Sequence, residues 1–144
     1  MKITLKKFSF NAALSEETYC FSADLYIDGK KRGCVSNRGH GEQTRFSDYD
    51  AQKQLDAYGA SLPPHPLHSF TRDGAFMVDL EVGCMVRIKE DKKMCKKGIV
   101  FIDPAEPDKY STYAIAYTEK NVAWVKAKHS CAVIINEQFG KPLK

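Results

Sequence analysis

A strict alternation of apolar and polar residues leads into a turn signal within residues 18–37, TYCFSADLYIDGKKRGCVSN. One face of this segment carries Tyr19, Phe21, Ala23, Leu25 and Ile27. Alternation with a period of two is typical of a strand that is buried on one side. The dipeptide Asp28-Gly29 accepts the positive φ angles of a tight turn, and residues 31–37 then form a return strand. The segment therefore predicts a β-hairpin.

The other elements complete an α+β pattern. Strands are expected at residues 3–10, 98–103, 110–117 and 131–136, and helices at 47–62, 76–97 and 119–129, the last capped by Thr118. The order is roughly βββααββαβ, and a chain of 144 residues suits one domain. We therefore predict a single α+β domain over residues 1–144. It has an antiparallel sheet with an N-terminal β-hairpin and two or three helices on one side.

The first expected helix has recognisable ends. Ser47, with Asp50 three residues later, resembles a capping box. An apolar stripe follows at helical spacing, formed by Ala51, Leu55, Tyr58 and Leu62. Gly59 and Pro63 are stop signals. We expect the helix to begin at Ser47 and to be ended by Gly59 and the prolines.

Residues 76–97 support two interpretations. Phe76, Val78, Leu80, Val82, Cys84, Val86 and Ile88 alternate as in a strand. Val78 and Val82 also match the spacing of one helix face, and lysines followed by Gly98 are typical of a helix end. The pattern favours a helix, and a strand over 76–90 is the alternative.

Cysteine usage and hydropathy indicate a compartment. The five cysteines include no C-x-x-C pair, which favours reduced thiols in a cytosolic protein. No run of about 18 apolar residues is present, so no membrane span or membrane partner is expected. His65 and His68 could approach one metal, but a zinc site needs further ligands at a spacing this sequence does not show. We expect a cytoplasmic protein without metal or cofactor.

The loop VSNRGHGEQTRF, residues 35–46, is the strongest functional signal. Its glycines allow backbone N–H groups to converge on an anion, and two arginines add forked donors suited to phosphate. The candidate ligand-binding residues are Asn37, Arg38, His40 and Arg45. The loop lacks the Gly-Lys-Ser/Thr ending of a phosphate-binding P-loop. It is either an anion site or a polar connection whose glycines serve its turns and whose Asn37 occupies a left-handed position.

Three further features offer alternatives. A lysine cluster within residues 89–97 includes Lys92, Lys93, Lys96 and Lys97, which form a candidate patch for nucleic acid or an acidic partner. Its own sequence contains no aromatic residues for base stacking. Tyr110, Tyr113, Tyr117 and Trp124 could form an exposed recognition surface or pack in the core. His40, with Cys34 or Ser36 as nucleophile and Asp48 or Asp50 as orienting group, would suit a small hydrolase.

The N-terminal third also carries a resemblance. The stretches TLKKF, SEETYCFSADLYIDGKK and VSNRGHG, with a closing Asn136-Glu137, resemble a group of short, uncharacterised proteins from phages and prophages. The resemblance implies an accessory protein of the host bacterial cytoplasm and carries over no catalytic residue. The resulting expectation is a small non-enzymatic protein that antagonises a host defence function. It would bind a host protein or sequester an anionic nucleotide-like ligand; nucleic-acid association and hydrolysis are the alternatives.

Overall fold

The computed structural model describes residues 1–63 and 72–144, and its fold class is α+β. Within these residues, seven strands form two antiparallel sheets, accompanied by three α-helices. The predicted class, with an antiparallel sheet and an N-terminal hairpin, is confirmed. The chain divides into two compact units, Met1–Val86 and Arg87–Lys144, called here the N-terminal and C-terminal units. Each unit is described by itself.

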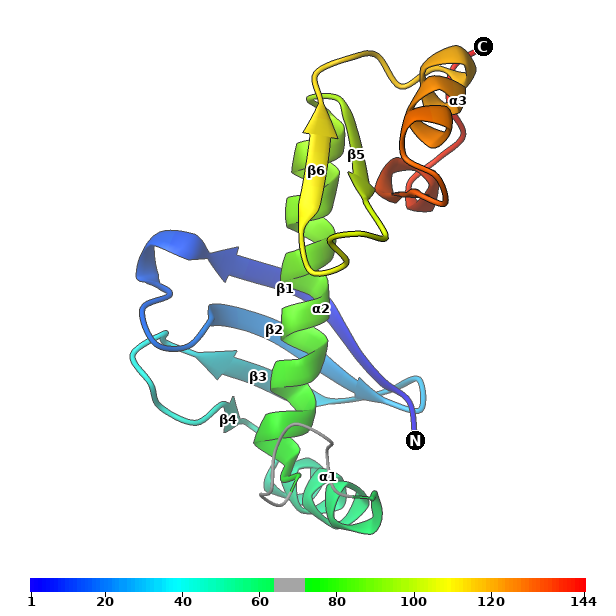
Figure 1. The fold of residues 1–144 in the computed structure, drawn as a ribbon. Coiled ribbons are helices and arrows are strands. Elements are labelled where there is room, and N and C mark those ends of the chain that lie inside the picture. The colour runs from blue at the N-terminus through cyan, green and yellow to red at the C-terminus, as the bar shows by residue number, and fades with distance from the viewer. Residues whose placement is uncertain (64–71) are drawn as a thin grey trace. The chain divides into compact units, whose positions relative to one another are not determined.

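The N-terminal unit contains a four-stranded sheet in the order β1-β2-β3-β4 (Figure 1). Its strands are β1 (Ile3–Asn11), β2 (Cys20–Ile27), β3 (Lys30–Asn37) and β4 (Arg45–Phe46), with a short 3-10 helix η1 (Ala12–Leu14) after β1. The predicted hairpin is β2–β3. Asp28 and Gly29 form its turn with φ angles of 48° and 81°, the left-handed conformation that this dipeptide accepts.

A β-bulge in β1 explains an irregular spacing of apolar residues. Lys6 pairs with Asp24, but the next partners are Ser9 and Ser22, so β1 holds one extra residue there. Lys7 occupies this position with φ of 50°. Because a shift of one residue exchanges the two faces of a strand, the bulge returns Phe8 and Phe10 to the core side. It also places Ser9 on the opposite side.

Helix α1 (Tyr49–Ser61) differs from its predicted ends. Its N-cap is Asp48, not Ser47, and the Asp48 carboxylate accepts the N–H groups of Asp50 and Ala51. The Ser47 hydroxyl instead accepts the N–H of Cys34 at 2.7 Å. Gly59 does not end the helix, which continues to Ser61. Gly59 is buried, and a Cβ at this position would overlap the carbonyl oxygen of Arg72. The glycine therefore serves a close backbone approach.

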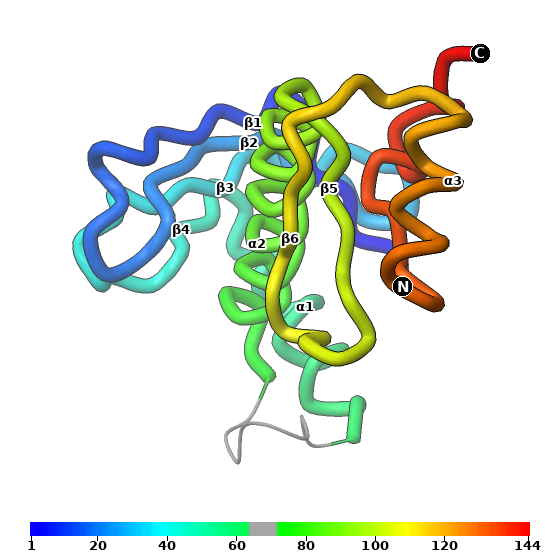
Figure 2. The backbone as a smooth tube through the Cα atoms, turned by 45° about the horizontal axis from the view of Figure 1, so that its top comes forward, coloured from blue at the N-terminus to red at the C-terminus, as the bar shows by residue number. Residues whose placement is uncertain are grey.

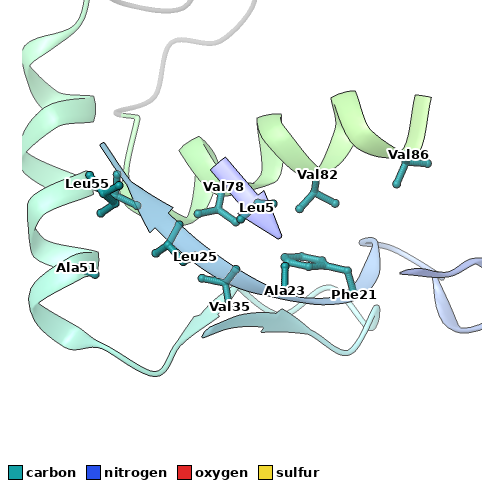
Figure 3. Packing of buried hydrophobic residues seen from close by; sticks show 11 residues of the cluster. Leu5, Phe21, Ala23, Leu25, Val35, Ala51, Leu55, Val78, Val82 and Val86 are labelled. Atoms are coloured by element: carbon teal, nitrogen blue, oxygen red, sulfur yellow. The ribbon is translucent and has the colours of Figure 1, made fainter. Parts of the chain in front are cut away.

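Residues 76–90 are helical, as favoured by the sequence: α2 runs over Gly74–Cys95. Asp73 accepts the N–H of Phe76 at its start. In the N-terminal unit, the face of α2 with Val78 and Val82 packs on the sheet (Figure 3). The fully buried members of this core include Leu25, Val35, Leu55, Val78 and Val82. Each such side chain contributes about 1.5–3 kcal/mol on burial. The helical conformation is therefore stabilised by the valines that it buries on one face.

The C-terminal unit contains a three-stranded sheet in the order β6-β5-β7. Its elements after α2 are β5 (Ile99–Ile102), β6 (Tyr110–Tyr113), α3 (Glu119–Lys128), β7 (Val133–Ile134) and the 3-10 helix η2 (Ile135–Gln138). Figure 2 shows β5 and β6 side by side, with α3 on the β5 side. Thr118 caps α3 by accepting the N–H of Asn121, as predicted.

The last predicted strand, residues 131–136, is largely wrong. Only Val133 and Ile134 pair in the sheet, and Ile135 and Asn136 begin η2. Ala132, Ile134 and Ile135 are nevertheless buried, so an apolar run identified burial but not backbone conformation. No helix in the described residues has the length and apolarity needed to cross a membrane.

Candidate functional site

Three of the four predicted ligand-binding residues line one cavity in the N-terminal unit. This cavity, called the hairpin-end pocket, has a volume of about 440 Å³. It is lined by Ser9, Asn11, Leu14, Cys20, Phe21, Ser22, Ser36, Asn37, Arg38 and His40. The fourth residue, Arg45, does not line it, but lies beside it as the pairing partner of Ser36.

A row of serines crosses the sheet at the pocket. Ser9 pairs with Ser22, and Ser22 pairs with Ser36, on three adjacent strands. Directly paired residues hold their side chains about 5 Å apart. All three serines are exposed, and no hydrogen bond to another described residue engages their hydroxyls. The row therefore presents three free hydroxyl groups that can each donate or accept.

The next row of the same sheet face is occupied by Asp24 and its partners. The carboxylate lies 3.0 Å from Lys31 Nζ and 3.6 Å from Lys7 Nζ, and it accepts the thiol of Cys34 at 3.4 Å. Hydrogen bonds from Lys31 and Cys34 hold the pKa of Asp24 below its ordinary value. This row is saturated by its own residues, unlike the serine row.

Asn37 supports the loop and is buried, with 4% of its surface exposed. Its Oδ1 accepts the hydroxyl of Thr18 at 2.9 Å and the N–H of Gly39 at 2.8 Å, and its Nδ2 donates to the Glu42 carbonyl at 2.7 Å. Asn37 ends β3 and is not among the residues with positive φ. It therefore holds the loop through its amide group and not through a left-handed backbone.

The loop glycines permit close packing against residues 14–18. Gly39 has φ of 91°, and a Cβ there would overlap the carbonyl oxygen of Leu14. Its own carbonyl accepts the N–H groups of Glu16, Glu17 and Thr18 at 3.0, 3.1 and 3.4 Å. The backbone N–H groups that were expected to converge on an anion are engaged by the protein. That of Arg38 donates to Glu42, that of Gly39 to Asn37, and that of Gly41 to Thr18.

The loop cations differ in how far carboxylates neutralise them. Arg45 donates to Glu42 Oε2 at 2.6 Å, and His40 Nδ1 lies 3.2 Å from Glu16 Oε2. Burial opposes the charged form of Glu42, but hydrogen bonds from Arg45 and from the Arg38 backbone lower its pKa overall. No ion pair joins the Arg38 guanidinium to a carboxylate of the described residues, although its charge also helps to lower the pKa of Glu42. Arg38 is therefore the cation most available to a ligand.

The N-terminus of α1 does not reinforce an anion at this loop. Asp48 already occupies it, and its pKa is lowered by the N–H of Ala51, against burial, with further help from Arg32. Arg32 Nε lies 3.2 Å from Asp48 Oδ2. The partial positive charge at this end of the helix is thus already neutralised by an internal carboxylate.

The arrangement expected for a hydrolase is only partly present. Ser36 and His40 line the same pocket, but among the described residues no hydrogen bond joins their side chains. The carboxylate beside His40 comes from Glu16, and Asp48 caps α1. Nucleophilic catalysis requires contact between nucleophile and base; Ser36 makes no such bond to His40, and the Cys34 thiol donates to Asp24.

The lysine cluster lies in the C-terminal unit and is divided. Lys92 and Lys96 line a second cavity, together with Tyr117, whereas Lys93 and Lys97 do not. Phe139 and Lys141 also line it. Sequence reasoning did not connect these last two with the lysines, because nothing local links residue 92 with residue 139. The only local signal for these two pocket residues was that aromatic and basic residues occur together near the end of the sequence.

The comparisons do not add a relative. No family model matches the sequence, and neither curated proteins nor solved structures give a match. Among the described residues, no group of three or more His, Cys, Asp or Glu side chains is arranged to hold a metal ion. His65 and His68 lie outside the described residues. All five cysteines are free thiols.

Proposed function

We propose that this chain is a small, non-enzymatic binding protein that sequesters an anionic, nucleotide-like ligand in the hairpin-end pocket. The observation that carries the proposal is the row of three free serine hydroxyls beside Arg38. Hydroxyl groups suit phosphate oxygens and sugar hydroxyls alike, since they both donate and accept. A guanidinium adds a forked donor that matches a phosphate group.

The dimensions and rigidity of the pocket support a small ligand. A volume of about 440 Å³ falls within the usual range for such sites. The serine row is fixed by the register of three hydrogen-bonded strands, and the loop is fixed by Asn37. The backbone that carries the donors is therefore in place before a ligand binds, which lowers the entropic cost of binding.

The proposed biological role follows from the class of protein that the N-terminal sequence resembles. The N-terminal resemblance to short phage and prophage proteins supports a role in the host bacterial cytoplasm. Sequestration of a nucleotide-like signal would antagonise a host defence function without catalysis. A host protein remains the alternative partner, and a pull-down from host lysate distinguishes it from a copurifying small molecule.

Calorimetry tests the ligand class directly. The four common ribonucleoside 5′-monophosphates, their nucleosides and inorganic phosphate are titrated into the protein. We expect a monophosphate to bind more tightly than its nucleoside. Arg38→Ala should weaken this binding by at least about tenfold, because a charged hydrogen bond contributes about 1.5–3 kcal/mol. Arg45→Ala should have a smaller effect, since Glu42 already engages Arg45.

Lys53→Ala is the matched control, because it removes one exposed positive charge from the same unit, on α1. Equal affinities in Arg38→Ala and Lys53→Ala would show that only net charge matters, and would remove the pocket from consideration. The absence of binding to every nucleotide would also contradict the proposal. Release of phosphate over time would instead favour the hydrolase alternative.

A further inference from the structure

The C-terminal unit contains a cavity of about 490 Å³, called the C-terminal pocket. Two of its walls come from distant parts of the sequence. Lys92 and Lys96 lie at the end of α2 and in the turn beyond it, and Phe139 follows η2. The pocket thus joins two members of the lysine cluster with the aromatic residues that the cluster lacks in sequence.

The charged side chains that line the C-terminal pocket are all positive. Lys92, Lys96 and Lys141 line it, and no carboxylate among the described residues does so. The nearby Glu137 is paired with Lys126, whose Nζ lies 2.7 Å from its carboxylate. Like charges brought together without counter-ions repel one another, so an anion placed between them would be attracted.

The apolar part of the pocket comes from Tyr117, Phe139 and Leu143. Lys92 Nζ lies 5.5 Å from the centroid of the Phe139 ring. The Tyr117 hydroxyl donates to the carbonyl of Gly140 at 3.0 Å, and burial raises the pKa of this tyrosine. Rings and cations are therefore adjacent, an arrangement that recognises an apolar body and a negative group together.

The pocket walls are held together by hydrogen bonds to backbone groups. Asn136 Oδ1 accepts the N–H of Val100 at 2.8 Å, and its Nδ2 donates to the carbonyls of Gly98 and Cys95. The segment with Leu143 is bonded in turn, because the Leu143 N–H donates to the Tyr117 carbonyl at 3.0 Å. These contacts connect the segments that carry the lysines, the rings and Leu143.

From this geometry we infer that the C-terminal pocket binds a small organic anion with an aromatic or aliphatic body. The lysines engage the anionic group, and the rings with Leu143 cover the apolar body. The volume lies in the range of small-molecule sites. A nucleic acid is less well matched, because the three lysines gather at one small cavity together with apolar side chains. The inference is independent of the hairpin-end pocket.

Two fluorescent probes separate the contributions of charge and apolar surface. The probes are 8-anilinonaphthalene-1-sulfonate and N-phenyl-1-naphthylamine, which share their rings but differ in the sulfonate. We expect saturable one-to-one binding of the sulfonate to the folded protein. The double variant Lys92→Gln with Lys96→Gln should weaken it by at least about tenfold and leave the neutral probe nearly unchanged. Phe139→Ala should weaken both probes.

The matched control is the double variant Lys93→Gln with Lys97→Gln, which removes the same charge from neighbours that do not line the pocket. Circular dichroism verifies that every variant is folded. Equal losses in the two double variants would overturn the inference, as would a lack of saturable sulfonate binding by the wild type. Tight, salt-sensitive binding of a single-stranded oligonucleotide that both double variants weaken alike would identify a nucleic-acid surface instead.

Discussion

The two pockets of this protein are built by different means. The hairpin-end pocket takes its donors from neighbouring strands, and the pairing register places Ser9, Ser22 and Ser36 in one row. The C-terminal pocket combines residues from the end of α2 with residues near the C-terminus, such as Lys92 and Phe139. The first site depends on the pairing register of consecutive strands, and the second on packing between segments that are far apart in the sequence.

The comparison extends to how each pocket is held. A buried asparagine lies beside both: Asn37 is 4% exposed and Asn136 is 3% exposed. Each amide makes three hydrogen bonds that join separate segments. Polar groups inside a protein must be satisfied, and here one side chain satisfies several backbone groups at once. Tertiary support is thus concentrated in single residues, which makes the comparison testable.

The largest expected effect comes from removing these amides. Asn136→Leu should lower the free energy of unfolding by about 4 kcal/mol and Asn37→Leu by about 3 kcal/mol, because each orphaned buried group costs about 1–3 kcal/mol. Asn136 should matter more, since all its partners are backbone groups, whereas the Thr18 hydroxyl can rotate towards water. Urea denaturation measures both. Asn121→Leu, which loses one exposed bond to Ala116, is the control, and losses as small as that of the control would contradict the assigned role.

Gly39→Ala should have the next largest effect, about 2–3 kcal/mol. It combines a left-handed residue with overlap at the Leu14 carbonyl, and overpacking alone costs about 1–3 kcal/mol. Gly29→Ala is matched in backbone conformation, with φ of 81°, but has no atom within 4 Å of the added Cβ. It should cost only about 1 kcal/mol. Thermal unfolding of the pair isolates the cost of the overlap, and equal values would show that residues 14–18 move aside freely.

The smallest effect should appear in the pH dependence of stability, with opposite signs in the two units. In the C-terminal unit, the Ala105 N–H and His129 lower the pKa of Asp103. Asp103 therefore stabilises the fold above its unfolded pKa, and this contribution is lost as pH falls through the folded value. In the N-terminal unit, burial raises the pKa of Asp79 despite the Thr44 hydroxyl. Asp79 therefore lowers stability as pH rises through its folded value.

Substitution by asparagine tests these signs. At pH 7, Asp103→Asn should be less stable than the wild type and Asp79→Asn more stable. The Asp79 difference should shrink as the pH falls from its raised folded pKa towards the unfolded value of about 3.9, and the Asp103 difference as the pH falls below that unfolded value towards its lowered folded pKa. Denaturation curves over this range provide the measurement. A difference that stays constant with pH would assign the effect to packing.

Sequence by itself determined the elements whose signal is local. The hairpin at Asp28-Gly29 and the Thr118 cap follow from the backbone conformations that these residues accept. The helix over residues 76–90 was favoured correctly, because its valine stripe and terminal lysines agree. Arg38 and His40 line one cavity because only Gly39 separates them in the chain, just after the end of β3.

Only the tertiary structure decided the features that depend on distant partners. Ser47 and Asp48 are both suitable helix caps. Asp48 caps α1, because the Ser47 hydroxyl accepts the N–H of Cys34 on strand β3. Gly59 resembles a helix stop, but it is required by the approach of Arg72. Lys92 and Phe139 likewise lie together only because the folded chain brings distant segments into contact. Local sequence sets backbone preference, whereas the partner of a side chain is set by packing between segments that are far apart along the chain.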